Sequence, residues 1–384
     1  MPTRVLVFHP ALAPYRIDLF NELAAAHSVR IVFLEGGLNG NALDVGAMRE
    51  QLSADHRYAG RGITVGGRNL GSGYAREIAA FDPEVVVTSE FGAASLAVAW
   101  HRRAVGGRYR HVLWTDDNPE SVRADRPHRR LMRSLLLRRI SALVTLSDEA
   151  TALYRDRYGY DGALASVPIL QREHTFRTAL AAAGDAASEL VARHGLGGCR
   201  VLLYVGRLAP EKGLADALRA FADASRARPD ARFVLVGDGP LRAELQRIVA
   251  GLGLGSRVLF AGHAQRATLH AWLRIGGSLV LPSVQETFGA VVNEALLAGL
   301  YVGCSRRAGA RILVREPEDG TLFEPGQAAD EVRAIEACLD ASAPVDGGGA
   351  CPERPSRMRI TFAESAEPLI RLLDELPRPG ARAA

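Results

Sequence analysis

Short apolar runs alternate with amphipathic stretches throughout the N-terminal part of the chain. Runs of four to seven residues rich in Val, Ile and Leu are typical of buried parallel strands, and the stretches between them have helical periodicity. Strands are expected at Val5–Phe8, Val29–Leu34, Glu84–Ser89, His111–Thr115 and Ile140–Leu146. Helices are expected over Ile17–Ala26 and after Ser147, whereas Gly36–Gly73 is Gly-rich and predicted to form loops. The alternation predicts βαβ units and a parallel sheet.

The same alternation recurs in the C-terminal part. Strands are expected at Val201–Val205, Arg232–Val236, Val258–Phe260, Leu279–Leu281 and Tyr301–Gly303, and helices over Ala179–Gly198, Leu214–Arg226, Leu241–Leu252 and Ala363–Leu376. We therefore predict an α/β protein with parallel-sheet domains at residues 1–175 and 176–362. A helix at 363–376 is expected to pack back on the first domain, followed by a disordered tail at 377–384. Ligands bind beyond the carboxyl ends of parallel strands, so the chemistry is expected in the loops there, facing a cleft between the domains.

Composition narrows the functional classes. Of 384 residues 48% are apolar and 23% charged, which is typical of globular domains, and a net charge of +4 gives no indication of a nucleic-acid partner. No apolar run reaches the roughly 18–20 residues that a membrane-spanning helix needs. The four cysteines form no Cys-x-x-Cys pair and match no zinc spacing. These features predict a cytoplasmic protein with reduced thiols and no metal site.

Lysine is almost absent from this arginine-rich chain. Lys212 is the single lysine among 47 Lys and Arg residues. A site that needs a compact ammonium would resist replacement by arginine, although chance survival is the alternative. Lys212 lies in the loop after Val201–Val205, which reads Gly206-Arg207-Leu208-Ala209-Pro210-Glu211-Lys212-Gly213. Arg207 and Lys212 beside a helix start suit two neighbouring phosphates, and a solvated surface turn is the simpler interpretation.

A second loop carries two carboxylates. It follows Leu279–Leu281 and reads Pro282-Ser283-Val284-Gln285-Glu286-Thr287-Phe288-Gly289-Ala290-Val291-Val292-Asn293-Glu294-Ala295. Glu286 precedes the expected helix and Glu294 lies about one turn inside it. A helix N-terminal carboxylate explains one acid, but not two. Both are explained if each accepts hydrogen bonds from hydroxyls, one on a sugar and one on a ribose. Between the two loops, Gly237-Asp238-Gly239 allows close backbone approach at a strand end, where a nucleotide would lie.

Three blocks together resemble family 4 of the retaining glycosyltransferases, which have the GT-B fold of two Rossmann-like parallel-sheet domains facing across a cleft. The blocks are Gly-Arg-Leu-x-x-Glu-Lys-Gly at 206–213, Val-Gly-Asp-Gly-Pro at 236–240 and Pro-Ser-x-x-Glu-Thr-Phe-Gly-x-x-x-x-Glu-Ala at 282–295. The resemblance is strong over about 200–335 and weaker before residue 170, where Pro14-Tyr15-Arg16-x-x-Leu19-Phe20 looks like the opening of one branch.

The resemblance implies that a hexose is transferred, with retention, from a UDP- or GDP-sugar to a glycan or lipid-linked acceptor, without cofactor or metal. It assigns the donor to the C-terminal domain and the acceptor to the N-terminal domain. Arg207 and Lys212 would hold the diphosphate and stabilise its departure. Glu286 would contact the transferred sugar and Glu294 the ribose. Catalysis would involve Glu286, Arg207, Lys212 and Asp116, and donor binding would add Gly206, Gly237, Asp238, Phe288, Gly289, Ala290 and Glu294.

The chain departs from the family on the acceptor side. Where many relatives have a glycine-rich loop, this chain has Tyr15 and Arg16, which we expect near the acceptor. Where many have a histidine after the fourth strand, it reads Trp114-Thr115-Asp116-Asp117-Asn118. Asp116 or Asp117 is expected to take the place of that histidine, and an Asx-type turn is the alternative for Asp117.

The segment Arg123–Arg139 contains seven arginines and one acid, with Leu and Met at near-helical spacing. A basic amphipathic helix of this kind suits an anionic membrane surface, which predicts peripheral association with the inner face of the membrane. The alternative is a core-packed helix with a solvated arginine face.

Two other functions are compatible with the resemblance. One is a GT-B-fold nucleotide-sugar epimerase, and the other is an inactive partner subunit of a glycosyltransferase. The inactive subunit would be expected to have lost Lys212, Glu286 or Glu294, and all three are present. A dinucleotide dehydrogenase is disfavoured because no Gly-x-Gly-x-x-Gly follows the first strand.

Overall fold

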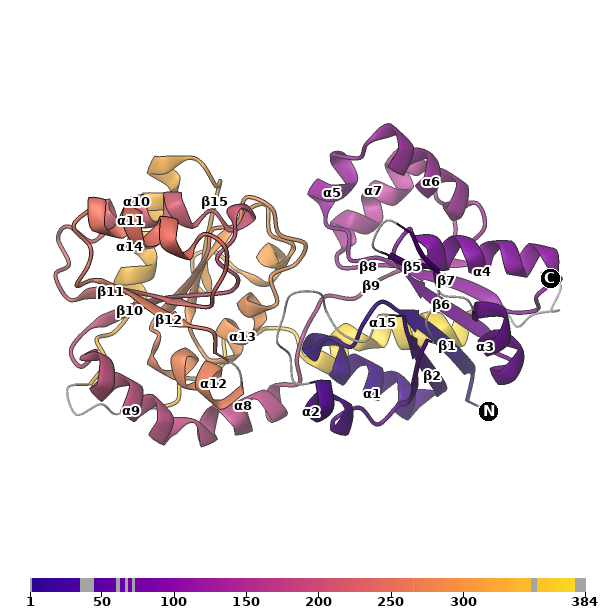
Figure 1. The fold of residues 1–384 in the computed structure, drawn as a ribbon, viewed down its shortest axis with the longest axis horizontal. Coiled ribbons are helices and arrows are strands. Elements are labelled where there is room, and N and C mark those ends of the chain that lie inside the picture. Colours follow the sequence, from indigo (N-terminus) through magenta and orange to yellow (C-terminus); the bar gives the residue numbers. More distant parts are fainter. Residues whose placement is uncertain are drawn as a thin grey trace. The chain divides into compact units, whose positions relative to one another are not determined.

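The computed structural model describes residues 2–34, 45–59, 63–65, 68–70, 73–264, 266–346 and 351–376. The chain folds into two compact units (Figure 1). Unit 1 comprises Met1–Ile169 and Phe362–Ala384, and unit 2 comprises Leu170–Thr361. The unit boundaries lie a few residues before the domain boundaries expected from the sequence.

Unit 1 is built on a seven-stranded parallel sheet in the order β3-β2-β1-β6-β7-β8-β9. The strands are β1 (Arg4–His9), β2 (Ser28–Phe33), β3 (Asp55–Tyr58), β6 (Val85–Ser89), β7 (Arg110–Trp114), β8 (Ala142–Thr145) and β9 (Ala163–Ser166). The sheet extends outward in both directions from β1, and therefore the strand order reverses between β1 and β6. Such a reversal opens a crevice at the carboxyl ends of the two strands.

Part of the segment predicted as loops is regular structure, and that prediction was wrong. Gly36–Gly73 contains the helix α2 (Val45–Glu50), the edge strand β3 and the two-stranded ribbon of β4 (Ile63–Val65) and β5 (Arg68–Leu70). The sequence of β3 is Asp-His-Arg-Tyr, with every side chain at least partly exposed. An edge strand of this kind is held by backbone pairing to β2 and lacks the apolar run on which the prediction relied.

Helices cover both faces of this sheet, as βαβ crossovers require. They are α1 (Ile17–Ala26), α3 (Tyr74–Phe81), α4 (Ala93–Ala104), α5 (Pro119–Arg123), α6 (Pro127–Leu137) and α7 (Asp148–Tyr158), with a short 3-10 turn η1 (Pro14–Arg16) before α1. Helix α15 (Phe362–Glu375), from the far end of the chain, packs against β9 and α1 and buries Phe362, Ala366 and Leu369 (Figure 1). Unit 1 is therefore completed by the last helix of the sequence.

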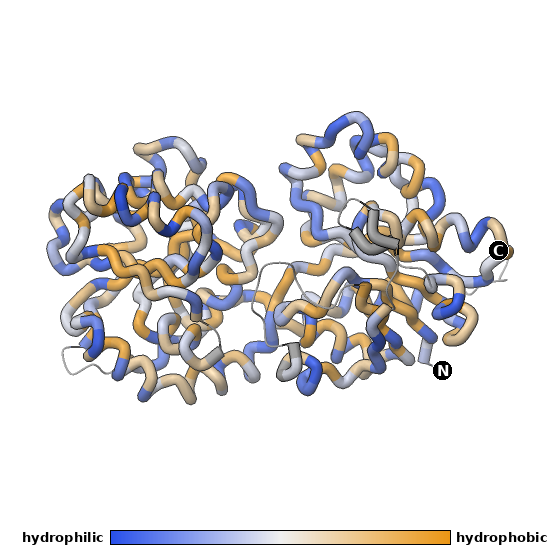
Figure 2. The backbone as a smooth tube through the Cα atoms, in the orientation of Figure 1, coloured by the Kyte–Doolittle hydropathy of each residue, from blue (hydrophilic) through white to orange (hydrophobic). Residues whose placement is uncertain are grey.

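Unit 2 contains a six-stranded parallel sheet in the order β12-β11-β10-β13-β14-β15. Its strands are β10 (Arg200–Val205), β11 (Ala231–Val236), β12 (Val258–Gly262), β13 (Ser278–Leu281), β14 (Tyr301–Ser305) and β15 (Gly320–Phe323). In both units the central strands are hydrophobic along their length (Figure 2). The order reverses between β10 and β13, which is the same topological switch as between β1 and β6.

The helices of unit 2 are α8 (Glu173–Ala182), α9 (Gly184–His194), α10 (Leu214–Ala224), α11 (Arg242–Gly251), α12 (Arg266–Ile275), α13 (Val291–Leu297) and α14 (Ala328–Ala341), with 3-10 turns η2 (Pro210–Lys212) and η3 (Gly309–Leu313). The single helix predicted over Ala179–Gly198 is in fact two helices that meet at Ala183. The second ends at Gly195, whose φ of 60° is the left-handed conformation that terminates helices.

Candidate active site

The loops after β10 and β13 meet at the switch point of unit 2. Gly213, with φ of 65°, starts α10, and a Cβ at this position would lie 2.3 Å from the carbonyl oxygen of Pro282. The amide of Val284 also donates to the carbonyl of Glu211 at 3.0 Å. Only glycine permits this approach, so the two sequence blocks of the predicted donor site are in direct backbone contact.

This contact brings Lys212 and Glu286 together. The Lys212 Nζ lies 2.5 Å from the Glu286 Oε2, and the Ser283 hydroxyl donates to the same oxygen at 3.1 Å. The lysine side chain is 18% exposed and the glutamate side chain 14%, so both are mostly buried but keep a small accessible surface that a ligand can contact. Residues 74 positions apart in sequence thus form one site with paired charges.

Arg207 lies in the same loop but in a more open position. Its side chain is 60% exposed and forms an ion pair at 2.6 Å with Glu211, four residues later in the chain. Both predicted diphosphate-binding cations therefore contact carboxylates of their own unit. A bound diphosphate would compete with these carboxylates for the two cations.

Glu294 projects from α13, the helix that follows the second loop. Its Oε1 accepts a 2.6 Å hydrogen bond from the Gln171 side-chain amide, while the Gln171 backbone amide donates to Asn293 at 2.9 Å. Burial raises the pKa of Glu294 to about 7, against the hydrogen bond from Gln171, which lowers it. The residue that holds this carboxyl, Gln171, was not identified from the sequence.

The loop after β11 packs against the loop after β10 through glycines. A Cβ on Gly237 would lie 1.9 Å from the carbonyl oxygen of Gly206, and one on Gly239 would lie 2.4 Å from that of Leu208. The Asp238 side chain is 55% exposed, accepts from the Gly239 amide at 2.8 Å and pairs with Arg242 at 3.3 Å. These glycines serve backbone packing, and Asp238 closes the turn.

Phe288, Gly289 and Ala290 lie between the two glutamates. Phe288 is 2% exposed, and its side chain belongs to the core. Gly289 has φ of 93°, and Ala290 is the N-cap of α13. The backbone of Gly289 and Ala290 can approach a ligand, whereas the buried side chain of Phe288 fixes the loop to the core.

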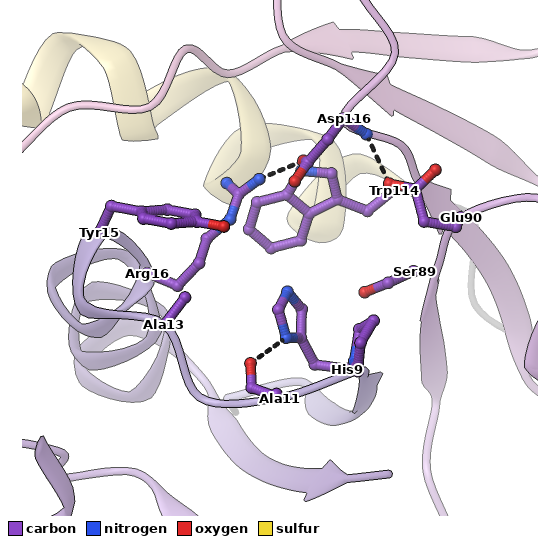
Figure 3. Close-up of a pocket in the computed structure, with 10 residues that line it drawn as sticks. His9, Ala11, Ala13, Tyr15, Arg16, Ser89, Glu90, Trp114 and Asp116 are labelled. Atoms are coloured by element: carbon purple, nitrogen blue, oxygen red, sulfur yellow. Dashed lines mark hydrogen bonds and ion pairs between the residues drawn. The ribbon is translucent and has the colours of Figure 1, made fainter. Parts of the chain in front are cut away.

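A cavity of about 110 Å³ lies at the switch point of unit 1 (Figure 3). His9, Ser89 and Trp114, the last residues of β1, β6 and β7, line it together with the predicted residues Tyr15, Arg16 and Asp116. Glu90 also lines it. The structure therefore brings three of the four acceptor-side residues together in one pocket.

Arg16 is the most deeply buried charge in this pocket. It is 1% exposed, forms an ion pair with Asp116 and lies over the Trp114 ring, with its Cζ 4.3 Å from the ring centroid. Its Nε and Nη1, and the indole Nε1 of Trp114, are buried with no hydrogen-bond partner among the described residues. Unsatisfied buried donors are costly, so they indicate a site that a polar ligand or water completes.

Asp117 does not line the unit 1 cavity, and its side chain is bound by other residues of unit 1. Its Oδ2 accepts hydrogen bonds from Arg133 at 2.7 Å and Tyr154 at 2.6 Å, and its Oδ1 accepts from Ser121 at 2.9 Å. These contacts also correct the alternative of an Asx-type turn at Asp117. The neighbouring Asn118 is the residue that caps a helix, by accepting from the Ser121 amide at 2.8 Å.

His9 and Glu90 were not identified as site residues from the sequence. Glu90 has a left-handed φ of 65°, rare for a residue with a side chain, and its carboxylate accepts from the Asp116 amide at 2.9 Å. Desolvation of its carboxyl group by surrounding protein atoms, together with the charges of Asp116 and Asp117, raises the pKa of Glu90. In the sequence, each of these residues stands at the end of an apolar run, and this position was the available signal.

Within the described ranges, no group of three or more His, Cys, Asp or Glu side chains is arranged to hold a metal ion. The same ranges contain no helix with both the length and the apolar character needed to cross a membrane.

Comparison with known proteins agrees with this geometry. The family described as glycosyl transferases group 1 matches residues 188–346, which include every predicted donor-site residue of unit 2. Residues 188–346 therefore resemble the group 1 glycosyl transferases. A 2-deoxystreptamine glucosyltransferase of Streptomyces kanamyceticus is 37% identical over 145 residues, or 38% of each chain. An alpha-D-kanosaminyltransferase of the same organism is 31% identical over 182 residues, 47% of this chain and 44% of that protein. The chain therefore matches less than half the length of these relatives.

Solved structures match the fold of nearly the whole chain. Anabaena HepE, crystallised with UDP and glucose, has a TM-score of 0.67 at 18% identity, over 96% of this chain and 94% of that chain. A sucrose-phosphate synthase from Thermosynechococcus elongatus has a TM-score of 0.65 at 19% identity, over 97% and 94%. The predicted fold class is confirmed: two Rossmann-like parallel-sheet domains of the GT-B type.

Proposed function

We propose that this protein is a family 4 glycosyltransferase that transfers a hexose, with retention, from a UDP- or GDP-sugar to a hydroxyl of a glycan or lipid-linked acceptor. The observation that carries the proposal is the contact between Lys212 and Glu286 at the switch point of unit 2, within the matched group 1 domain. Retention, the hexose and the acceptor type come from the resemblance of the motifs.

The unit 2 geometry supports a diphosphate leaving group. In our proposal the diphosphate takes Lys212 and Arg207 from their present carboxylate partners, and Glu286 turns to the hydroxyls of the sugar. Negative charge grows on the diphosphate as the bond between its oxygen and the anomeric carbon of the sugar breaks, and the two cations stabilise this charge without a metal ion. Glu294, held by Gln171, accepts hydrogen bonds from the ribose hydroxyls.

The test is transfer measured across a panel of UDP- and GDP-sugars, with acceptor hydroxyls on mono- and oligosaccharides and on a lipid-linked sugar. We expect one nucleotide series to raise the melting temperature, since a donor at 100 times its Kd stabilises by roughly 2.7 kcal/mol. NMR of the product would show an anomeric configuration identical to that of the donor. An inverted product would disprove retention, and interconversion of donor sugars without an acceptor would favour the epimerase.

Peripheral membrane binding is the second part of the proposal, and the exposed surface of α4 and α6 supports it. In α6, Leu136 and Leu137 are buried, as the core-packed alternative expects, but Leu131 is 62% and Leu135 46% exposed. The neighbouring α4 exposes Trp100 at 69% and Leu96 at 44%. Neither helix contains an acidic residue, and Arg102 of α4 donates to the carbonyl of Arg139 just after α6. Exposed apolar residues among arginines match an anionic lipid surface.

Flotation with liposomes tests this surface directly. We expect binding to vesicles with anionic lipid and little binding to neutral ones, weakened by salt. The double variant Trp100→Ser, Leu131→Ser should lose flotation, whereas Leu252→Ser, an apolar residue of unit 2 that is 38% exposed, should retain it. Equal flotation of all three proteins would exclude the α4–α6 surface as the docking site.

A further inference from the structure

We propose that His9 is the catalytic residue of the acceptor side, and that its Nε2 accepts a hydrogen bond from the attacking hydroxyl of the acceptor. The inference rests on the proposed transferase function. No sequence motif identifies His9, and the catalytic role on the acceptor side was expected for Asp116. His9 is the last residue of β1 and lies at the switch point of unit 1.

The tautomer of His9 follows from its neighbour. Its Nδ1 lies 2.8 Å from the carbonyl oxygen of Ala11. A carbonyl oxygen only accepts hydrogen bonds, so Nδ1 carries the hydrogen, and Nε2 of the neutral ring is left with a lone pair. Figure 3 shows this second nitrogen pointing away from Ala11, into the space bounded by Tyr15, Trp114 and Ser89.

Aromatic packing holds the imidazole in this orientation. The ring meets Phe20 edge-on at a centroid distance of 5.3 Å, Phe33 at 6.3 Å and Trp114 at 6.4 Å. Edge-to-face contacts at these distances are favourable and restrict rotation about the side-chain bonds. The lone pair is therefore aimed before any ligand binds, which is the preorganisation that a catalytic acceptor needs.

The electrostatic surroundings keep the ring neutral. Burial and the nearby Arg16 guanidinium lower the pKa of His9 to about 4, against the smaller opposing effect of Asp116. A protonated ring would have no acceptor nitrogen, so a histidine that is neutral throughout the physiological range is suited to bind a hydroxyl. The same low basicity means that His9 orients the hydroxyl and does not keep its proton.

The other groups of the pocket favour a hydroxyl over a charged ligand. A hydroxyl can donate to His9 Nε2 and accept from the unpartnered Nε1 of Trp114 or the Nε and Nη1 of Arg16. A carboxylate would meet the charge of Asp116, and an ammonium would meet Arg16. The substrate class is therefore a neutral polyol or sugar hydroxyl.

The transfer step balances without a further reactant. The hydroxyl oxygen bonds to the anomeric carbon of the donor as the bond from that carbon to the diphosphate oxygen breaks. The hydroxyl proton leaves with the departing diphosphate, and the products are the glycosylated acceptor and the nucleoside diphosphate.

Two substitutions of His9 separate its two nitrogens. His9→Asn can keep the hydrogen bond to Ala11 but has no atom at the position of Nε2, whereas His9→Gln can place its amide oxygen near that position. We expect His9→Asn to lower kcat/KM for the acceptor at least about tenfold, with partial recovery in His9→Gln. The Kd of the nucleotide sugar should stay unchanged in both.

His56 provides a matched control within unit 1. Its Nδ1 also contacts a carbonyl oxygen two residues away, that of Ala54 at 3.0 Å, but it belongs to the edge strand β3. His56→Asn should transfer like the wild type. If His9→Asn also transfers like the wild type, or if His9→Asn and His9→Gln lose activity equally while folded by thermal melting, the role of Nε2 is disproved. If the wild type neither binds nor hydrolyses any nucleotide sugar, the proposed function itself has failed.

Discussion

The two units have the same reversal of strand order, but different groups occupy the crevice at that point. In unit 2 the reversal between β10 and β13 is closed by backbone, because glycines let three loops touch, and its charges are paired and partly exposed. In unit 1 the reversal between β1 and β6 is lined by side chains, with a buried arginine, aromatic rings packed edge to face and donors that have no partner among the described residues.

This difference decides what a sequence can reveal. Close backbone approach requires glycine at fixed positions, so the residues of the unit 2 site lie in short contiguous motifs that are recognisable in the sequence. The unit 1 pocket draws single side chains from the ends of β1, β6 and β7, and no local pattern joins them. A site built by close backbone contact, like that of unit 2, is therefore recognisable from sequence motifs. A site built from separate side chains, like that of unit 1, becomes apparent only from the three-dimensional fold.

Removal of Asp117 should have the largest effect on stability. Its carboxylate is 11% exposed and accepts from Arg133, which is 6% exposed, so Asp117→Ala leaves a buried cation with less compensation. We expect a loss of about 3–5 kcal/mol in the free energy of unfolding, measured by denaturant titration.

Asp238→Ala is the counterpart of that substitution in unit 2. Asp238 also follows a strand end, but its side chain is 55% exposed, so we expect a loss of no more than about 1 kcal/mol. Equal losses for Asp117→Ala and Asp238→Ala would show that the two switch points do not differ in the way described.

Lys212→Ala should have the largest effect on catalysis. If Lys212 stabilises the departing diphosphate, its removal should lower kcat by about 100- to 1,000-fold, as loss of one such donor typically does. Arg219→Ala, which removes an exposed cation paired with Asp216 on α10, is the control and should leave kcat unchanged. A wild-type kcat in Lys212→Ala would remove the central support for the unit 2 site.

Glu294 should give the smallest effect, a dependence of donor binding on pH. Its pKa of about 7 means that the ionised form, which accepts from ribose hydroxyls, gains population as the pH rises from 6 to 8. The Kd of a nucleotide sugar, whose diphosphate does not titrate in this range, should therefore be up to about tenfold weaker at pH 6. Glu294→Gln should abolish this dependence, and calorimetry would measure it.

The same raised pKa affects folding in the opposite direction. Between the ordinary pKa of a glutamate and about 7 the folded state binds more protons at Glu294 than the unfolded state, so this residue lowers stability as the pH rises through that range. Denaturant midpoints of wild type and Glu294→Gln should therefore diverge as the pH rises from 5 to 8. A constant difference would mean that Glu294 titrates normally.

The central strands and the unit 2 loops could be predicted from the sequence because burial on both faces and close backbone contact leave strong local patterns. The edge strand β3 could not, since its exposed side chains alternate without an apolar run. Asp117 was expected near the acceptor because position alone could not separate it from Asp116. Their different partners, Arg133 for one and Arg16 for the other, depend on which helix and turn fold over the end of β7.

Helix α15 has a consequence for the order in which the molecule can be made. Unit 1 begins at the first residue but takes Phe362 and Leu369 of this helix into its core. The helix follows unit 2 in the chain, so the apolar face of unit 1 that it covers stays exposed until the whole of unit 2 has been synthesised. Expression of the first 169 residues by themselves would reproduce this incomplete state and favour aggregation.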